Sequence, residues 1–465
     1  MAHEWSTLHE LLLPAVSDAT RGKRGRAVEN ELRRAIRDGR LAPGSRVPSS
    51  RDLAGQLGLA RGTVSAAYAQ LVGEGYLVAE RGSGTRVANR VGRAQTTPPP
   101  RRTRVDLHPG LPSLSSFPRA EWLAAHRAAL ADLPHEALGY PDPAGLTSLR
   151  GELAGYLGRV RAAQVDPESL VITNGAAEGL ALIARELHRR GHRTVAVEDP
   201  SHLGQAELLA SHGLRPVPVP VDDHGIRVDR LAASGSRAVL VTAAHQFPLG
   251  VVLHPDRRHR LLDWAGEHDG LVIEDDYDAE HRYDRPALGA MQALDPARVI
   301  YQGSVSKVLA PALRLGWLVL PPALLPEVVE RKRLDDLGSA TLPQAAFAQL
   351  LRSGGYDRHL RRTRALYRRR RDALLAGLAT VDGCEPVGIA AGLHVVLRLP
   401  AGTDDRQVQR MLADEGVSAP ALSGYAHAAT TFPGLVIGYA ALTTEQIDDA
   451  VTALARVLTS VATRP

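Results

Sequence analysis

The residues best suited to chemistry gather around one lysine, in the stretch RVIYQGSVSKVLAPALRLGWLVL. Lys307 lies between two apolar, strand-like runs, with Ser304 and Ser306 just before it and Arg314 seven residues after it. A lysine at a turn that leaves a buried strand is partly desolvated, so its amine can lose a proton and form a Schiff base with an aldehyde. Serine hydroxyls and a guanidinium suit a phosphate. The spacing therefore predicts a covalently held aldehyde cofactor that carries a phosphate.

Other lysines offer little competition for this role. The sequence contains only two more, Lys23 in a basic N-terminal run and Lys332 in the charged segment RKRLDD. The Ser-x-Lys pattern is weak when taken alone, because a solvent-exposed lysine at the end of a strand gives the same letters. The surrounding sequence is what favours the chemical interpretation.

The elements that would position this lysine alternate between strands and helices. Helical stretches separate most of the apolar runs, which occur at 170–174, 194–198, 238–242, 271–275, 298–302 and 316–320. Such alternation predicts a mainly parallel sheet covered on both faces, with ligands bound beyond the carboxyl ends of the strands. We expect a domain over residues 105–465, with a large subdomain at about 165–345 and a smaller one built from the flanking segments.

Further candidate residues follow other strands. The run TNGAAEGL opens a helix at Gly175, so the N–H groups of Ala176 and Ala177 can seat a phosphate, although most such turns bind nothing. In LVIEDDYDAE, strand alternation places Asp275 and Tyr277 on one face. A carboxylate there can keep a pyridine nitrogen protonated while the phenol hydrogen-bonds a ring oxygen. The alternative is an acidic strand end that caps a helix.

Residues 1–87 predict a winged helix. Helical periodicity is present at 24–38, at 50–57 after a serine N-cap, and at 61–71, and a short turn joins the last two helices. This arrangement is typical of a helix-turn-helix, whose second helix presents its first residues to the major groove of DNA. The following segment, YLVAERGSGTRV, predicts a hairpin with a flexible, basic turn that can lie along phosphates.

The distribution of charge agrees with a nucleic-acid-binding N-terminal domain. Residues 1–104 hold 18 Lys and Arg against 9 Asp and Glu, whereas the remainder holds 38 against 42. A basic module joined to a mildly acidic one favours nucleic-acid binding by the first, with a generically basic surface as the alternative. Residues 88–104 contain three consecutive prolines and predict a semi-rigid linker. An arginine-rich helix at 361–371 is ambiguous between a solvated face and a second DNA contact.

The sequence resembles the MocR/GabR-type branch of the GntR family of bacterial regulators over roughly residues 20–460. The Lys307 stretch and the block PGSRVPSSRDLAGQLGLARGTVSAAYAQLVGEGYLVAERGSGTRV carry the resemblance. In this family a winged-helix DNA-binding domain is fused to an α/β, fold-type-I aminotransferase-like domain that binds pyridoxal 5′-phosphate. The resemblance implies that Lys307 forms the Schiff base. The implied DNA-contact residues are Ser49, Ser50, Arg51, Arg61, Thr63, Gly82, Ser83, Gly84 and Thr85.

The resemblance also implies further residues around the cofactor. It places His245 and Gln246 beside the ring, although Phe247 stands where aminotransferases usually have asparagine. His202 stands where a tyrosine is usual, so an imidazole would stack on the ring. Tyr140 would reach the phosphate of the partner subunit, so that each site is built at a homodimer interface.

Two departures from the family pattern have consequences. Ala60 replaces a usual serine N-cap, which should cost about 1 kcal/mol of local helix stability. Val436 stands where family members that bind amino acids offer an arginine to the carboxylate. We therefore expect α-amino acids to bind poorly and the effector to be pyridoxal phosphate itself or an amine without that carboxylate. Another arginine, such as Arg285 or Arg398, would have to restore the site.

The expected function is that of a transcription regulator that binds operator DNA and senses a small molecule through its cofactor. The alternative is a working aminotransferase with an accessory DNA-binding head. The single cysteine, Cys384, excludes an intrachain disulfide, and no apolar run approaches the roughly 20 residues that span a bilayer. The N-terminus lacks the features of a signal peptide. We expect a cytoplasmic protein without a membrane partner.

Overall fold

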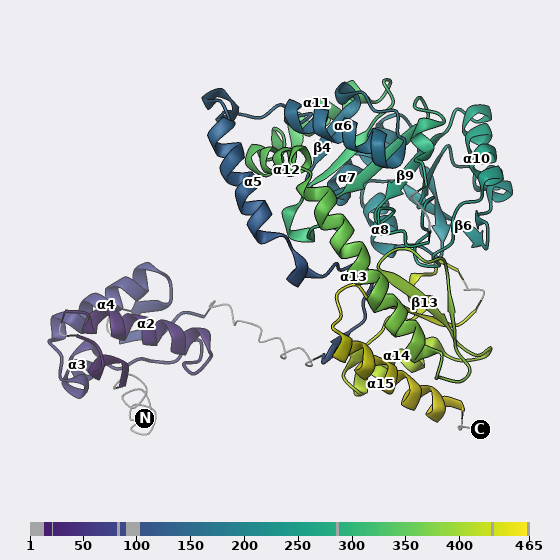
Figure 1. Ribbon diagram of the computed structural model, residues 1–465. Helices are drawn as coiled ribbons and strands as arrows, with labels where there is room; N and C mark the ends of the chain where they lie inside the picture. The colour runs from purple at the N-terminus through teal and green to yellow at the C-terminus, as the bar shows by residue number, and fades with distance from the viewer. Residues whose placement is uncertain are drawn as a thin grey trace. The chain divides into compact units, whose positions relative to one another are not determined.

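The computed structural model describes residues 14–20, 22–80, 84–89, 103–284, 288–428 and 432–462. The chain divides into two compact units, one before and one after residue 101 (Figure 1). Three features of the sequence lie outside the described residues: the wing positions Gly82 and Ser83, most of the expected linker, and Arg285. Among the described helices, none combines the length and apolar character that crossing a bilayer requires.

The described part of the first unit contains the three helices and the hairpin that the periodicity predicts, and residues 14–17 are helical as well. Apolar residues from all three helices and from both strands form one core, which includes Leu32, Leu53 and Val64. The wing hairpin pairs Leu77 with Val87 at its base. The elements are α2 (Arg24–Arg37), α3 (Ser50–Leu57), α4 (Arg61–Gly73), β1 (Leu77–Glu80) and β2 (Gly84–Val87).

The ends of α3 and α4 show how the local sequence sets these helices. Ser49 caps α3, because its side chain accepts a hydrogen bond from the Asp52 backbone N–H. Gly58 ends α3 in the left-handed conformation at φ 59°, which a glycine adopts without strain. Ala60 precedes α4 and makes no side-chain cap bond, as the sequence predicts.

A mixed sheet of eight strands forms the centre of the second unit. Its four central pairs, from β10 to β6, are parallel, whereas β11 is antiparallel to both of its neighbours and β7 is antiparallel to β6. In spatial order the strands are β4 (Leu170–Thr173), β11 (Gly316–Val319), β10 (Val299–Ser304), β9 (Leu271–Asp276), β8 (Ala238–Val241), β5 (Thr194–Asp199), β6 (Arg215–Asp222) and β7 (Gly225–Ile226).

Strand β6 is missing from the sequence-based expectation because its sequence, RPVPVPVD, contains three prolines. The prolines alternate with valines, so all three lack an N–H on the same edge of the strand. Pro220 accepts a hydrogen bond from Arg227 through its carbonyl, which shows that this edge faces away from β5. The valine positions pair with β5, as Val217 does with Ala196. A proline-rich strand therefore survives one place from the edge of the sheet.

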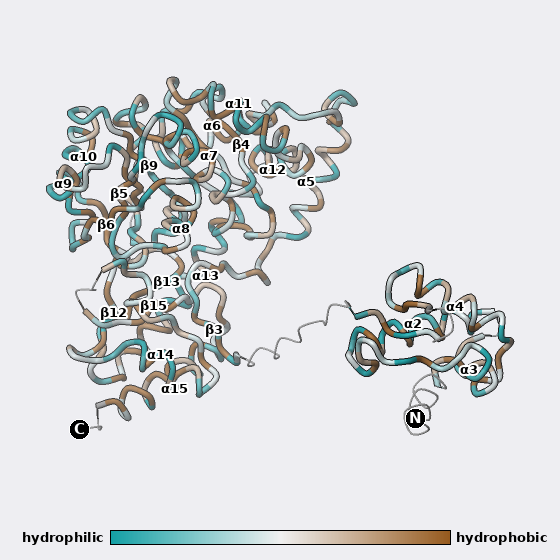
Figure 2. Tube along the Cα trace, turned by 180° about the vertical axis from the view of Figure 1, so that it is seen from behind, coloured by the Kyte–Doolittle hydropathy of each residue, from teal (hydrophilic) through white to brown (hydrophobic). Residues whose placement is uncertain are grey.

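Helices cover both faces of this sheet, and alternate residues of each strand contribute to the apolar core on one face or the other. In β4, Val171 packs against one group of helices and Ile172 against the other. Helices α7 (Ala176–Arg189), α8 (Leu203–Ser211) and α11 (Leu325–Asp336) cover the first face. The other face is covered by α5 (Arg119–Asp132), α6 (Thr147–Arg161), α9 (Leu231–Ser234), α10 (Pro255–Glu267) and α12 (Thr341–Arg352). In Figure 2, β5 is hydrophobic over most of its length, whereas α10 carries many hydrophilic residues.

A smaller subdomain packs beside the central sheet at the end of the long helix α13 (Gly355–Leu378) (Figure 1). It has its own apolar core, which includes Tyr367, Leu397 and Leu454. Its remaining elements are β12 (Glu385–Val387), β13 (His394–Arg398), β15 (Gly434–Gly438), β14 (Val417–Ser418), β3 (Val105–Asp106), α14 (Asp405–Asp414) and α15 (Thr444–Ala462). Short 3-10 helices of this unit lie at Leu114–Ser116, His135–Leu138, Pro167–Ser169, Val228–Arg230, Met291–Ala293, Pro311–Leu313 and Leu422–Tyr425.

Candidate functional site

A cavity of about 610 Å³ lies at the carboxyl ends of the parallel strands, where open α/β sheets bind ligands. Residues that follow β5, β9 and β10 line it, together with the start of α7. The cavity brings together most of the predicted cofactor residues: Ala176, Ala177, His202, Asp275, Tyr277, Ser304, Ser306, Lys307 and Arg314. Gly175, His245, Gln246 and Tyr140 do not line it.

Lys307 follows β10 and extends into this cavity. Its Nζ donates a hydrogen bond to the Gly110 carbonyl oxygen at 2.7 Å. Burial lowers the pKa of Lys307, and the carboxylates of Asp278 and Asp275 oppose that shift. A Cβ on Gly110 would lie 2.9 Å from Nζ, so only glycine allows this approach. The amine is thus held closer to its neutral, nucleophilic form than an exposed lysine.

One end of the cavity suits a phosphate. Helix α7 begins at Ala176 without a side-chain cap, so its first N–H groups remain open to an anion. Arg314 donates to the Asn174 carbonyl oxygen at 2.5 Å and lies against Gly175. A Cβ on Gly175 would meet the guanidinium at 2.8 Å, which explains the glycine at this position. Gly175 therefore acts by admitting Arg314 rather than by lining the cavity.

Asp275 gives the cavity a buried carboxylate. It accepts hydrogen bonds from Gln205 at 2.6 Å and from Gln302 at 3.1 Å. Burial raises the pKa of Asp275, which these two amides oppose. A ring N–H⁺ of a ligand would offset the cost of burying this charge. Neither glutamine was predicted from the sequence, although Gln302 is a polar residue in an apolar strand and pairs with Asp275 in register.

Tyr277 and Asp278 both line the cavity, and the buried His245 contacts both of them. The Tyr277 hydroxyl is 3.1 Å from Nδ1 of His245, which is 3.0 Å from Oδ2 of Asp278. Burial holds the pKa of Tyr277 well above its usual value, so the phenol keeps its proton. His245 was predicted beside the ring of the cofactor, and the structure places it behind Tyr277.

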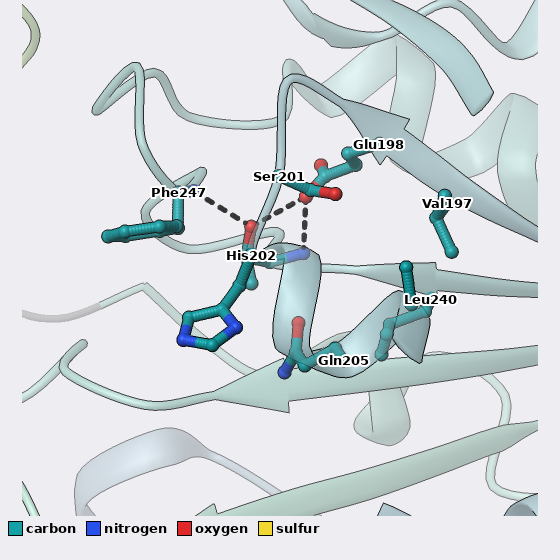
Figure 3. A pocket seen from close by; sticks show the side chains of 9 residues that line it. Val197, Glu198, Ser201, His202, Gln205, Leu240 and Phe247 are labelled. Atoms are coloured by element: carbon teal, nitrogen blue, oxygen red, sulfur yellow. Dashed lines mark hydrogen bonds between the residues drawn. The ribbon is translucent and has the colours of Figure 1, made fainter. Parts of the chain in front are cut away.

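Gln246 belongs to a hydrogen-bond network that shapes the loop after β8. Its amide donates to the carbonyl oxygens of Pro200 and Phe247 at 2.9 and 2.7 Å. Glu198 accepts from the Thr242 hydroxyl at 2.6 Å, and Thr242 accepts from the Phe247 N–H (Figure 3). Burial raises the pKa of Glu198 to about 7. This network therefore positions the loop. The Gln246 amide is already hydrogen-bonded within it and does not line the cavity.

Aromatic and imidazole rings form another part of the cavity wall. The ring of His202 lies 5.9 Å from that of Phe247, which also contacts the rings of His394 and Tyr425 at 5.1 and 5.3 Å. His108, Gly110 and Leu393 complete the lining from the small-subdomain side. No local pattern marks these residues, because they come from segments far apart in the sequence.

The structure places Val436 and Arg398 where neither can bind a ligand carboxylate. Val436 is fully buried in β15 and packs with Val396 and Leu422. Arg398 pairs with Glu385 at 3.2 Å and stacks over Phe432. Among the described residues that line the cavity, Arg314 at the phosphate end is the only arginine.

Tyr140 projects from the second unit, with 89% of its surface exposed. Further large exposed apolar residues lie on α5 and α12, on or just after α11, and on the 3-10 helix His135–Leu138. These elements adjoin one another, since a Cβ on Gly338, after α11, would meet Pro141 at 3.0 Å, and Gln349 of α12 bonds Asp132 of α5. The residues are Leu123, Leu130, Leu138, Leu334, Leu337 and Leu342.

The predicted DNA-contact residues of the first unit lie at two helix starts and on the wing. Arg61 and Thr63 occupy the first turn of α4, and Arg61 is exposed. Ser49, Ser50 and Arg51 occupy the start of α3, where the Ser49 side chain is bonded to Asp52. On strand β2 the wing presents Gly84 and Thr85.

Comparison with known proteins accounts for both units. The model for bacterial regulatory proteins of the gntR family matches residues 24–87, and that for aminotransferase class I and II matches residues 112–454. The kynurenine aminotransferase of Pyrococcus horikoshii has the same fold, with a TM-score of 0.71 and 26% identity, covering 78% of this chain and 93% of that one. Fold and site thus define a GntR winged helix joined to a fold-type-I aminotransferase-like domain.

Two relatives share this whole arrangement. The HTH-type pyridoxine biosynthesis transcriptional regulator PdxR of Corynebacterium glutamicum is 35% identical, over 88% of this chain and 90% of its own. The probable rhizopine catabolism regulatory protein MocR of Rhizobium meliloti is 32% identical, over 92% of each chain. The chain belongs to the MocR/PdxR-type regulators of the GntR family.

Proposed function

We propose that this protein is a DNA-binding transcription regulator that holds pyridoxal 5′-phosphate on Lys307 and uses it to sense a small molecule. The observation that carries the proposal is the placement of Lys307, partly buried and with a lowered pKa, in one cavity with Asp275 and Arg314. When bound, the cofactor supplies an aldehyde for the lysine and a ring that withdraws electrons.

The side chains divide the work of holding such a cofactor. Asp275 receives the ring nitrogen, and Tyr277 donates a hydrogen bond to the ring oxygen. His202 lies against the ring. The phosphate is held by Arg314 and by the first N–H groups of α7, with the hydroxyls of Ser304 and Ser306. These roles agree with the cavity lining, which includes every one of these side chains.

A sensing role is better supported than catalytic turnover. The two relatives that match both units are named as transcriptional regulators, and the GntR domain is present in this chain. Turnover requires productive binding of two substrates in succession, whereas sensing requires only different affinities for two conformations. The attached winged helix gives such a conformational difference a readout on operator DNA.

The effector is pyridoxal phosphate itself or an amine without an α-carboxylate. Val436 stands at the position that the family resemblance gives to the carboxylate-binding arginine, and Arg398 is paired with Glu385 and does not line the cavity. A carboxylate buried without a charge partner costs several kcal/mol, which reduces affinity by orders of magnitude. Ordinary α-amino acids therefore bind poorly.

The working form is a cytoplasmic homodimer. Tyr140 is too exposed to serve the cavity of its own chain, and the exposed leucines on adjoining elements form an apolar surface of the kind that protein interfaces bury. In the dimer, Tyr140 reaches the phosphate held by the partner subunit. Each cofactor site is then complete only after association.

A titration followed by absorbance tests this proposal. Wild-type protein given pyridoxal phosphate should gain a visible band that borohydride reduction fixes to the chain, and Lys307→Ala should show none while its circular dichroism is unchanged. α-Amino acids should leave the band of the loaded wild type unaltered at concentrations at which plain amines shift it. A reducible bond in Lys307→Ala would refute the assignment of the Schiff base to Lys307. Tight, saturable shifts with α-amino acids would refute the prediction that they bind poorly.

A further inference from the structure

One buried imidazole lies within hydrogen-bond distance of three oxygens that belong to two residues of the cavity lining. Nδ1 of His245 is 3.1 and 3.0 Å from the two carboxylate oxygens of Asp278, and 3.1 Å from the hydroxyl of Tyr277. His245 and Asp278 are 3% and 1% exposed, so water does not substitute for these contacts. The three side chains must share the available protons among themselves.

The sharing has one consistent solution. A carboxylate only accepts hydrogen bonds, so the contact with Asp278 requires a proton on Nδ1 of His245. A protonated Nδ1 has no lone pair and cannot accept the proton of Tyr277. Since burial keeps the Tyr277 hydroxyl protonated, that proton is free to point into the cavity that Tyr277 lines.

Residues of the small subdomain hold the pair in place. Gly392, at φ 72°, packs so closely that a Cβ there would lie 2.2 Å from Cε1 of His245 and 2.6 Å from Oδ2 of Asp278. Tyr283 and Tyr439 donate hydrogen bonds to the Gly392 carbonyl oxygen at 2.6 and 2.8 Å. The backbone behind the pair is therefore fixed from both sides.

Of the surrounding titratable groups, Asp278 and His245 are the two that determine where the Tyr277 hydroxyl proton points. His394 donates from Nε2 to the Pro248 carbonyl at 3.0 Å, and burial lowers its pKa to about 4, so it remains neutral. The charged or titratable groups that act on Tyr277 are Asp278, Asp275, Glu198 and Tyr439. Of these, only Asp278 also contacts His245.

We propose that Asp278 and His245 are positioning residues that make Tyr277 an obligatory hydrogen-bond donor toward the cavity. The inference rests on the proposed function, because the acceptor that it supplies is the ring oxygen of the bound cofactor. Asp278 fixes the tautomer of His245, and in that tautomer Nδ1 cannot accept a hydrogen bond from Tyr277. The site therefore selects ligands that offer a hydrogen-bond acceptor to the Tyr277 hydroxyl, as the ring oxygen of the cofactor would.

A double-mutant cycle on cofactor affinity tests the coupling. Tyr277→Phe removes the donor and should weaken affinity for pyridoxal phosphate about tenfold, as expected for a hydrogen bond to a charged acceptor. Asp278→Asn should weaken it about three- to tenfold, because a neutral side chain no longer requires a proton on Nδ1, so the other tautomer of His245 can offer the Nδ1 lone pair to Tyr277. In the Tyr277→Phe background, Asp278→Asn should change the logarithm of the dissociation constant for pyridoxal phosphate by less than half as much as it does in wild type.

The charge of Asp278 has a second effect that the cycle separates. Asp278 also acts on the pKa of Lys307, and this effect persists when Tyr277 is replaced. Equal effects of Asp278→Asn in the two backgrounds would therefore overturn the positioning role. If Asp278→Asn fails to fold, Asp278→Ser enters the same cycle, since it also removes the carboxylate that requires a proton on Nδ1. Asp222→Asn, which removes the partner of Arg257 at the far edge of the sheet, is the control and should leave affinity unchanged.

A metal site is the competing account of these residues. His245, Asp278 and His394 offer ligand atoms within 4.8 Å of one another. One equivalent of zinc bound tightly by wild type and lost in Asp278→Asn would overturn our assignment, since a metal would displace the Nδ1 proton. Failure of wild type to retain pyridoxal phosphate would refute the proposed function. Retention with an additive cycle would refute only this inference.

Discussion

At the residue scale, Glu198 shows how closely the chemistry of the site is tied to its support. The carboxyl group is fully buried at the end of β5 and accepts the backbone N–H and the hydroxyl of Thr242. Burial raises its pKa from an ordinary 4.5 to about 7, and nearby Asp275 adds to the shift. The folded state therefore favours the protonated form of Glu198 more than the unfolded state does.

This shift predicts a pH-dependent stability difference. An acid with a raised folded pKa contributes stability below its unfolded pKa, and that contribution is lost as the pH rises through the folded value. Glu198→Gln, which stays neutral, should gain on wild type between pH 4.5 and about 7 by about 1–3 kcal/mol. Urea unfolding of both proteins at pH 5 and pH 8 measures this gain. A difference in stability that is the same at the two pH values would contradict it.

Lys307, Asp275 and Arg314, which the sequence predicts at one site, line one cavity, and their roles there stay predictions. Each lies at or near an end of an apolar strand, so the place of the strand indicates the edge of the sheet at which they meet. Gln205 and His394 carry no such mark, because only tertiary packing brings α8 and β13 to the cavity. His245 was predicted beside the cofactor ring but does not line the cavity, and its contact with Asp278 depends on the fold.

At the element scale, the start of α4 is the feature most relevant to DNA. Arg61 is exposed in the first turn of this helix, which corresponds to the part of a recognition helix that enters the major groove. The spacing of apolar residues predicts this helix, and the expected core residues Val64, Ala67, Tyr68 and Leu71 are all buried.

Arg61→Ala should weaken operator binding without changing cofactor occupancy. A recognition-helix arginine that contacts a base contributes about 1–3 kcal/mol, which corresponds to roughly 5- to 150-fold in affinity. Fluorescence anisotropy with labelled operator DNA measures the change. Arg26→Ala, exposed on α2, removes the same charge and should have a smaller effect. An unchanged isotherm for Arg61→Ala would show that α4 does not dock in this way.

Elements were easier to predict than their pairing. The apolar runs predict six strands of the central sheet, because buried strands have a plain hydrophobic signal. The antiparallel direction of β11 has no local signal, since it depends on how the chain returns between β10 and β4. β6 was missed because prolines normally exclude a strand. Here the prolines alternate with valines, so the edge that pairs with β5 keeps its N–H groups.

At the scale of the whole molecule, the site is proposed to depend on two chains. Tyr140 is exposed in one chain, whereas Lys307 is partly buried and lines the cavity. If Tyr140 contributes to the partner's site, each cofactor site takes its Lys307 from one chain and its Tyr140 from the other. Complementation between two defective proteins then becomes possible.

Mixing Lys307→Ala with Tyr140→Phe should restore cofactor binding. A mixed dimer contains one site with both wild-type residues, because the intact lysine meets the intact tyrosine of the other chain. Absorbance titration after unfolding and refolding the two variants together should show a class of sites with wild-type affinity, which neither variant shows alone. Separate refolding followed by brief mixing is the control. Absence of the tight class in refolded mixtures that sediment as dimers would contradict the shared site.

The central claim is that occupancy of the Lys307 cavity changes how the winged helix engages DNA. A dimer presents two winged helices, so we expect protection of two half-sites, direct or inverted, in the DNA upstream of its own gene. The most direct measurement is footprinting on that DNA with and without pyridoxal phosphate, for wild type and Lys307→Ala. We predict that the cofactor changes the affinity or the extent of protection for wild type and has no effect on Lys307→Ala. Identical footprints for wild type with and without the cofactor, while absorbance shows the protein to be loaded, would contradict the account.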